Sequence, residues 1–214
     1  MRLVLPRLYV ILDAALLTHP EIQMAGSLAD AGVRLLQYRN KSASSRELLE
    51  KSRALAAELL PRKTTFIVND RPDVAALAGA SGVHLGQDDL GVEAARSLMD
   101  QSSIVGISTH NQAQFRAAVS SSADYIAIGP IFETSSKRDP DPVVGLETIR
   151  QVRRLTDKPI VAIGGITLER APEVIAAGAN SVAVISDILR AADPAKRARQ
   201  FIDLLESANQ AAAK

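Results

Sequence analysis

The sequence has no cysteine and no tryptophan, and aromatic residues make up only 3% of its 214 residues. The lack of cysteine excludes disulfides, thiolate catalysis and cysteine-type zinc sites. So few aromatic rings leave few stacking surfaces for single-stranded nucleic acid. Lys and Arg number 25 against 24 Asp and Glu, so a net charge of +1 offers no basic surface for nucleic acid. We therefore expect no nucleic-acid partner.

Long hydrophobic runs are also missing. The apolar stretch in the opening MRLVLPRLYVILD is too short to span a bilayer, and it lacks a small-residue cleavage site. We therefore expect no membrane association and a cytoplasmic location. A hydrophobic content of 47% is ordinary for a globular protein, and no composition break divides the chain. The expectation is a single domain over residues 1–214 with a core from about 7 to 207; the oligomeric state stays open, with a homo-oligomer among the options.

Short runs rich in Val and Ile alternate with helical patterns rich in Ala and Leu. The strand-like runs are RLYVIL, VRLLQY, TTFIVN, GVHLG, SIVGIS, DYIAIG, PIVAIG and SVAVIS. Strands that alternate with helices favour parallel pairing, with both faces of the sheet buried. Eight such units in about two hundred residues predict an α/β fold, the (β/α)8 TIM barrel, near its lower size limit. The competing doubly wound open sheet usually has a Gly-rich turn after its first strand, and LDAALLTHP has no glycine.

Helix signals agree with this reading. Ser44 and Glu47 form a capping-box pair at the start of a helix expected over 44–60. The last helix is expected from Pro194 to about Ala208. It should direct three apolar side chains inward: Phe201, Leu204 and Leu205.

A TIM barrel carries its active site at the C-terminal ends of its strands, so polar residues should gather there. In the stretch QYRNK, alternation along a strand directs Gln37, Arg39 and Lys41 to one face. An exposed strand end whose long side chains reach water would give the same pattern, whereas the alternative is a bound anion such as a diphosphate. The other strand ends carry Asn69 and Asp70, GQDD, Ser108, Gly129, Gly164 and Gly165, and Ser186.

Charges of both signs are expected at this rim. Arg39, Lys41 and Lys137 supply cations, and Asp70 and Asp89 supply carboxylates. The aspartates alone would repel an anionic substrate, but Mg²⁺ is commonly held by carboxylate and phosphate oxygens together. Arg and Lys would then neutralise the remaining phosphate charge. Ordinary salt bridges at the rim are the alternative.

A second anion site is indicated after the seventh and eighth strands. The segments AIGGI and VISDIL match the usual phosphate position of this fold, where backbone N–H groups bind the anion. Glycine lets the backbone approach such a ligand closely. Two phosphate-bearing ligands in one barrel suggest a reaction that joins them while one loses diphosphate.

Seven blocks together carry a resemblance to a known family. They are QYRNK, VNDRPDVA, GVHLGQDD, VGIS, ADYIAIGPIFETSSK, IVAIGGI and AVISDI, in this order. From about Arg7 to Leu205 the chain resembles the thiamine phosphate synthase family. The resemblance implies a (β/α)8 barrel that uses Mg²⁺. It implies two small-molecule substrates, 4-amino-2-methyl-5-hydroxymethylpyrimidine diphosphate and 4-methyl-5-(2-hydroxyethyl)thiazole phosphate or its carboxylated form. They would be joined through a carbocation-like pyrimidine, releasing diphosphate and giving thiamine phosphate.

The resemblance also implies residue roles. The pyrimidine diphosphate would be bound by Gln37, Arg39, Lys41, Asn69, Ser108 and Lys137. Of these, Arg39, Lys41, Ser108 and Lys137 would be the catalytic residues. Asp70 and Asp89 would hold the magnesium ion, with Asp88 as a neighbour. The thiazole phosphate would be received by Thr134, Ser136, Gly165, Ile185 and Ser186. Ser136 stands where family members often have threonine, and the hydroxyl is retained.

Two other functions are the alternatives to a synthase. A related thiazole tautomerase shares the fold, but NDR, GQDD and the proline of GPIF follow the synthase pattern. Loss of the metal aspartates would favour a non-catalytic phosphate-ligand sensor, and both aspartates are present. His84 in the fourth strand and His110 in the next loop are expected to pack or to support ligand-binding residues, and His19 to be exposed.

Overall fold

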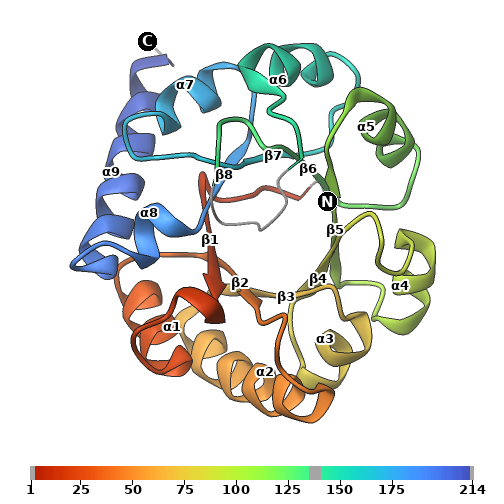
Figure 1. The fold of residues 1–214 in the computed structure, drawn as a ribbon, viewed down its shortest axis with the longest axis vertical. Coiled ribbons are helices and arrows are strands. Elements are labelled where there is room, and N and C mark those ends of the chain that lie inside the picture. The colour runs from red at the N-terminus through yellow and green to blue at the C-terminus, as the bar shows by residue number, and fades with distance from the viewer. Residues whose placement is uncertain (1–2, 135–140, 213–214) are drawn as a thin grey trace.

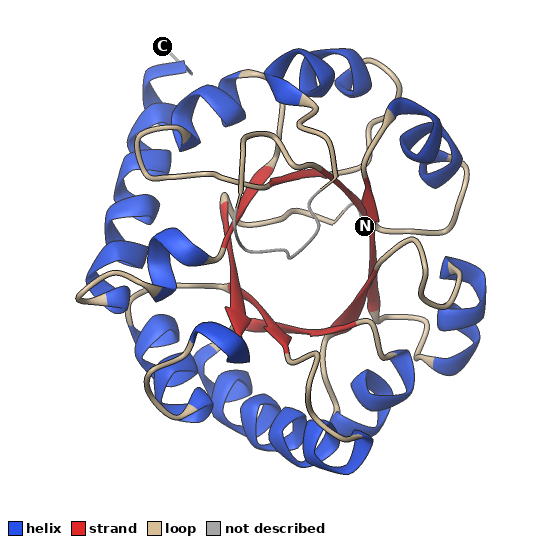
Figure 2. Ribbon diagram, in the orientation of Figure 1, coloured by secondary structure: helices blue, strands red, loops and turns tan. Residues whose placement is uncertain are grey.

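The computed structural model describes residues 3–134 and 141–212, with side chains as far as residue 207. Within these ranges eight parallel strands form a closed barrel with helices around it (Figures 1 and 2). The strands are β1 (Leu8–Asp13), β2 (Leu35–Arg39), β3 (Thr65–Asn69), β4 (Gly82–Leu85), β5 (Ile104–Thr109), β6 (Tyr125–Ile128), β7 (Ile160–Ile163) and β8 (Ser181–Val184). The barrel closes where β1 pairs with β8, with Val10 opposite Val184. The closed barrel is therefore confirmed and the open sheet is excluded.

The helices follow the strands in the expected alternation. The longer ones are α1 (Glu21–Asp30), α2 (Ser45–Leu59), α3 (Pro72–Ala78), α4 (Val92–Leu98), α5 (Gln112–Val119), α6 (Gly145–Arg153) and α9 (Pro194–Ala212). The shorter ones are α7 (Ala171–Ala176), α8 (Ser186–Leu189) and two 3₁₀ turns over Ala14–Leu16 and Leu60–Arg62. The Ser44 side chain accepts from the Glu47 N–H at 3.2 Å, which confirms the predicted cap of α2.

The last helix packs on the barrel through one face only. Phe201 and Leu205 are fully buried, but Leu204 is 37% exposed, so its expected burial is wrong. Positions four apart lie on one helix face, and the buried face is centred between Phe201 and Leu205 with Ala198 alongside. Leu204 falls at the margin of this face. Truncating Phe201 to alanine would cost roughly 3–5 kcal/mol of stability.

The core has two layers because side chains alternate along each strand. Outward-facing residues such as Val10, Val68 and Val182 pack against the helices. Inward-facing residues fill the barrel interior: Leu5, Tyr9, Ile11, Leu35, Ile67, Tyr125, Ala127, Val161 and Ala183. The interior is therefore a packed core beneath the rim, as in TIM barrels generally.

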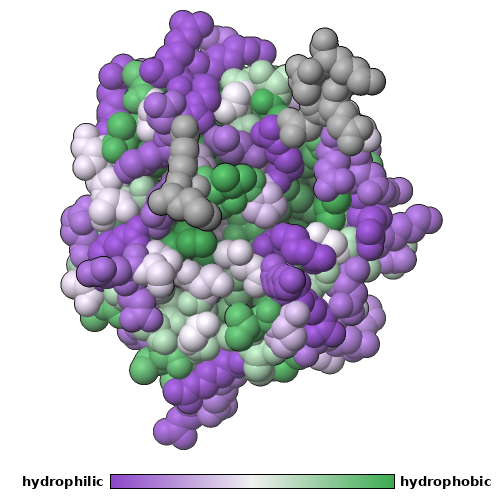
Figure 3. All heavy atoms as spheres, turned by 180° about the vertical axis from the view of Figure 1, so that it is seen from behind, coloured by the Kyte–Doolittle hydropathy of each residue, from purple (hydrophilic) through white to green (hydrophobic). Residues whose placement is uncertain are grey.

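None of the described helices combines the length and the apolar composition that crossing a bilayer requires. On the face seen in Figure 3, hydrophilic residues surround smaller hydrophobic areas. Scattered surface hydrophobics of this kind are normal for folded proteins.

Candidate active site

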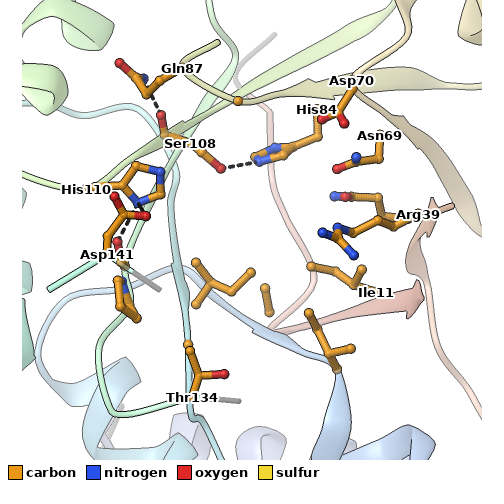
Figure 4. A pocket seen from close by; sticks show the side chains of 18 of the residues that line it. Ile11, Arg39, Asn69, Asp70, His84, Gln87, Ser108, His110, Thr134 and Asp141 are labelled. Carbon is orange, nitrogen blue, oxygen red and sulfur yellow. Dashed lines mark hydrogen bonds and ion pairs between the residues drawn. The ribbon is translucent and has the colours of Figure 1, made fainter. Parts of the chain in front are cut away.

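A cavity of about 500 Å³ opens at the C-terminal ends of the strands. Most of the sequence-predicted site residues line it: Gln37, Arg39, Lys41, Asn69, Asp70, Asp89, Ser108, Thr134, Gly165, Ile185 and Ser186. Figure 4 shows Arg39, Asn69 and Asp70 on one side and Thr134 apart from them. The predicted residues Ser136 and Lys137 lie outside the described part of the chain. The barrel thus brings together residues that are far apart in sequence.

The end of β2 directs its long polar side chains into the cavity. Arg39 donates from Nη1 to the Asp13 carboxylate at 2.5 Å, and Lys41 forms an ion pair with Asp70. Asp13 and Arg39 are paired positions of β1 and β2, so the register places them side by side. The Asp13 side chain is 5% exposed and that of Lys41 is 57% exposed. Salt bridges at the rim therefore exist, and both cations also face the cavity.

The outward-facing residues of QYRNK, Tyr38 and Asn40, fix the loop that follows β2. The Tyr38 hydroxyl donates to Glu21 at 3.3 Å and accepts from Asn40 at 3.1 Å. The Asn40 side-chain oxygen accepts from the backbone N–H groups of Ser42 and Ala43 at 3.1 and 3.0 Å. The predicted alternation along QYRNK is therefore confirmed, and its outward-facing residues fix the start of the loop after β2.

Two aspartates meet at the ends of β3 and β4. Asp70 has a positive φ of 64°, and its N–H donates to the His84 carbonyl at 2.7 Å. Asp89 accepts from the Gly86 N–H at 2.7 Å. Burial, and next the adjoining Asp70 carboxyl, raise the pKa of Asp89 above its usual range, although the Gly86 N–H and Lys41 oppose the shift. The repulsion of two carboxylates that share one place is relieved when a cation binds between them.

Asp70 and Asp89 provide only part of the ligand set that a divalent cation needs. Among the residues that the structure describes, no three His, Asp or Glu side chains converge on one point. Two carboxylates suit Mg²⁺ only if phosphate oxygens and water complete its octahedral shell, which is the usual arrangement for this ion. The pair Asp70 and Asp89 therefore fits a magnesium ion that arrives with a phosphate-bearing ligand.

Beneath the cavity, buried polar groups form a continuous hydrogen-bonded chain. Gln37 Nε2 donates to the Tyr9 hydroxyl at 2.7 Å, and the Tyr9 and Tyr125 hydroxyls are 3.0 Å apart. His84 Nδ1 is 2.9 Å from the Tyr125 hydroxyl, and its Nε2 is 2.8 Å from Ser108 Oγ. His84 thus packs in the core and supports Ser108, as expected from its strand position. The two tyrosines were not singled out from the sequence, where they look like ordinary core residues.

Burial decides the protonation states of His84, Tyr9 and Tyr125 in this hydrogen-bonded chain. It lowers the pKa of His84 to about 4, although the charge of Asp89 opposes the shift. Burial also raises the pKa of both Tyr9 and Tyr125 above the usual range. All three groups are therefore neutral near pH 7, because each charged form would lose its hydration.

At the ends of β7 and β8, away from the charged side chains, backbone groups form the rim. Gly164 and Gly165 have φ values of 101° and 62°, a region that favours glycine. A Cβ atom on Gly165 would lie 2.3 Å from the Glu133 carbonyl oxygen. Ile185 and Ser186 lie where β8 leads into α8, beside these glycines in the cavity wall. This part of the wall offers N–H groups and a hydroxyl, the groups that bind a phosphate without a cation.

The two other histidines differ in position. His110 lines the cavity, and its Nδ1 is 2.8 Å from the Gly129 carbonyl and 3.4 Å from an Asp141 carboxylate oxygen. A carbonyl only accepts, so Nδ1 carries a proton and does not serve as a base. His19 is exposed and bonds Thr18 at 3.0 Å. The sequence did not assign ligand binding to four polar residues that line the cavity: Gln87, His110, Gln114 and Asp141. It also did not single out Asp13, which pairs with Arg39.

The chain is similar to known proteins along nearly its whole length. A family model described as thiamine monophosphate synthase matches residues 8–188. The thiamine-phosphate synthase of Koribacter versatilis is 52% identical over 95% of this chain and 97% of that protein. That of Agrobacterium fabrum is 42% identical over 96% of both. The structure of thiamine phosphate pyrophosphorylase from Pyrococcus furiosus superposes with a TM-score of 0.86 at 32% identity, covering 94% of this chain and 96% of that one. The chain belongs to the thiamine monophosphate synthase family.

Proposed function

We propose that the chain acts as a thiamine-phosphate synthase. It would join 4-amino-2-methyl-5-hydroxymethylpyrimidine diphosphate to 4-methyl-5-(2-hydroxyethyl)thiazole phosphate, or its carboxylated form, and release diphosphate. One observation carries this proposal beyond family membership: a single cavity holds a charged wall with two aspartates and a separate glycine-rich wall. Two walls of different chemistry suit two phosphate-bearing substrates that must react with each other.

The charged wall suits the pyrimidine diphosphate. Arg39 and Lys41 are oriented at the cavity and would exchange part of their contact with Asp13 and Asp70 for phosphate oxygens. Asn69 ends β3 on the same wall, and Ser108 lines the cavity from β5. Asp70 and Asp89 would hold Mg²⁺. The ion would supply charge neutralisation for the departing diphosphate.

The glycine-rich wall suits the thiazole phosphate. Gly165 and Ser186 would donate backbone and hydroxyl hydrogen bonds to its phosphate, and Ile185 would contact it beside them. Thr134 lines the cavity between the walls, and the neighbouring Ser136 would add a second hydroxyl. Lys137 would complete the cationic contacts of the diphosphate. A substrate phosphate held by backbone needs no mobile side chain, which favours a fixed position for the thiazole ring.

The chemistry then needs no protein nucleophile. Loss of diphosphate leaves a carbocation-like methylene on the pyrimidine, which the ring amino group stabilises, and the thiazole nitrogen attacks it. Arg39, Lys41, Ser108 and Lys137 would act as the catalytic residues by stabilising the leaving group and orienting the ring. No strongly basic side chain is required, in agreement with the neutral state of His84.

A direct assay tests this proposal against the two other functions. Purified protein would be incubated with both substrates and Mg²⁺, and thiamine phosphate and diphosphate would be measured together. Equal amounts of the two products are expected. Interconversion of thiazole forms without diphosphate release would indicate a tautomerase, and ligand binding without any product would indicate a sensor.

A further inference from the structure

The buried chain from Gln37 to Ser108 begins and ends on residues that line the cavity. It passes through Tyr9, Tyr125 and His84, with each consecutive pair of polar atoms between 2.7 and 3.0 Å apart. The three inner side chains are at most 8% exposed. A polar chain under the floor of a ligand cavity therefore connects β2 with β5 through the barrel interior.

The barrel makes room for this chain at one glycine. His84, Gly106 and Tyr125 are paired positions across β4, β5 and β6. A Cβ atom on Gly106 would lie 2.0 Å from the Tyr125 ring, so the missing side chain is what lets the two rings meet. The His84 and Tyr125 rings stack with centroids 5.5 Å apart at 16°, and Tyr9 meets Tyr125 edge-on at 6.1 Å. The rings are thus held by packing, and their hydrogen bonds have little freedom.

Each tyrosine hydroxyl of this series has two polar neighbours, so one donation and one acceptance by each makes all the hydrogen bonds run in one direction. Gln37 donates to the Tyr9 oxygen. The Tyr9 proton then goes to Tyr125, and the Tyr125 proton goes to His84 Nδ1. A neutral imidazole whose Nδ1 accepts carries its proton on Nε2, which then donates to Ser108 Oγ. The two ends are therefore linked: Gln37 is left with its carbonyl oxygen as an acceptor, and Ser108 is left with its hydroxyl proton as a donor.

We infer that this chain selects a 4-aminopyrimidine over its 4-oxo counterpart by fixing the hydrogen-bond polarity of Gln37 and Ser108 together. The inference rests on the proposed function and names the specificity of the same site. A 4-aminopyrimidine has an amino donor on C4 and, directly across the ring, a lone pair on N1. These match the free acceptor of Gln37 and the free donor of Ser108. The ends of β3 and β4, which carry Asp70 and lead to Asp89, lie between β2 and β5, so the C5 substituent can reach the aspartates.

The oxo ring in its more stable N3–H form cannot satisfy both ends. Its O4 accepts, so Gln37 would have to turn its amide nitrogen toward the ring. Tyr9, Tyr125 and His84 would then reverse, and Ser108 would donate to His84 and present only lone pairs to the lone pair of N1. Only the less stable N1–H form would fit the reversed chain. Because the N3–H form loses one polar contact in either direction, we expect about tenfold discrimination in kcat/KM.

The test breaks the chain without removing a ring. Tyr125→Phe deletes the hydroxyl in the middle of the chain and lets Gln37 and Ser108 orient independently. Tyr9→Phe does the same one step earlier and serves if the first variant folds poorly. Tyr38→Phe is the matched control, because that hydroxyl bonds Glu21 and Asn40 on the outer face of β2. Each protein would be assayed with the 4-amino pyrimidine diphosphate and with its 4-hydroxy analogue.

We expect the preference for the amino substrate to fall about tenfold in Tyr125→Phe and Tyr9→Phe and to stay unchanged in Tyr38→Phe. Nitrogen-15 NMR of labelled histidine gives a second measurement without turnover. The protein has three histidines, so the NMR signals of His84 are assigned by comparison with His19→Gln and His110→Gln. With the amino ligand bound, His84 should be in the Nε2–H form. An Nδ1–H form, or an unchanged preference in both chain variants, would overturn the inference. A wild type that binds both substrates but forms no thiamine phosphate would instead overturn the proposed function.

Discussion

The two walls of the cavity are built in different ways. The wall at β2–β4 carries charge on long side chains, and these charges already pair with one another, as Arg39 with Asp13 and Lys41 with Asp70. The wall at β7 and β8 carries glycines at positive φ and the start of α8. Side-chain charge can be exchanged between partners when a ligand and a metal arrive, whereas backbone N–H groups stay where the fold puts them.

The two walls should bind their ligands with different dependences on salt, metal and backbone geometry. A ligand at the charged wall must compete with existing ion pairs, and its affinity should depend on salt and metal. A ligand at the glycine-rich wall meets groups with little conformational entropy to lose, and its affinity should depend on backbone geometry. Substitutions should therefore affect one substrate or the other, according to the wall that they alter.

The largest effect is expected at the aspartates. Asp89→Asn, or chelation of Mg²⁺, should lower thiamine phosphate formation by about 100-fold or more, because the metal offsets several kcal/mol of developing negative charge. Asp88→Asn is the matched control, since Asp88 is a neighbouring, exposed carboxylate. Product formation over a magnesium titration measures the effect. Full activity in chelator would remove the metal from the mechanism.

A smaller effect is expected at Arg39 and Lys41. Replacing either with alanine removes a charge-assisted contact of about 1.5–3 kcal/mol, so pyrimidine diphosphate binding should weaken roughly 10- to 150-fold. Thiazole phosphate binding should be nearly unchanged. Titration calorimetry with each ligand separates the two, and Arg116→Ala on exposed α5 serves as the control. Equal losses for both ligands would mean that the two walls do not divide the substrates.

The glycine-rich wall should respond to a single methyl group. Gly165→Ala would place Cβ 2.3 Å from the Glu133 carbonyl, so the loop after β6 must move and thiazole phosphate binding should weaken. Gly79→Ala is the matched control. Gly79 has a similar φ of 68° but has no atom within 4 Å of an added Cβ. Both variants should lose about 1–2 kcal/mol of stability from backbone strain, Gly165→Ala should lose more because of its clash, and only Gly165→Ala should lose ligand affinity. Thermal unfolding and ligand titration distinguish the two effects.

The smallest effect is expected at Asp13. Asp13→Asn keeps an oxygen for the Ala15 N–H, which Asp13 now accepts at 3.1 Å, but it removes the charge opposite Arg39. Because the diphosphate no longer competes with this carboxylate for Arg39, which is partly exposed, pyrimidine diphosphate affinity should rise by about 0.5–1 kcal/mol, or roughly 2- to 5-fold. Steady-state kinetics with each substrate varied in turn would show whether KM for the pyrimidine alone falls. No change would make Asp13 a purely structural partner.

Much of the fold and of the charged wall could be predicted from the sequence, for local reasons. Alternation along QYRNK decides which side chains share a face, and helix signals such as Ser44 and Glu47 act within one turn. Strands followed by helices leave few ways to bury both faces of a sheet. The burial of Leu204 was wrong because the margin of a helix face depends on the shape of its neighbours, which periodicity alone does not contain.

The sequence by itself determined the barrel, the rim residues and the chemical contrast between its walls, because these depend on residue type and position along each strand. Only the tertiary structure decided which groups meet. Tyr9 and Tyr125 bond across 116 residues of chain, and Asp13 meets Arg39 because β1 and β2 pair in one register. The neutral state of His84 likewise comes from burial, a property of the closed barrel. Such partners lie far apart along the chain, and no local pattern records that they will be neighbours.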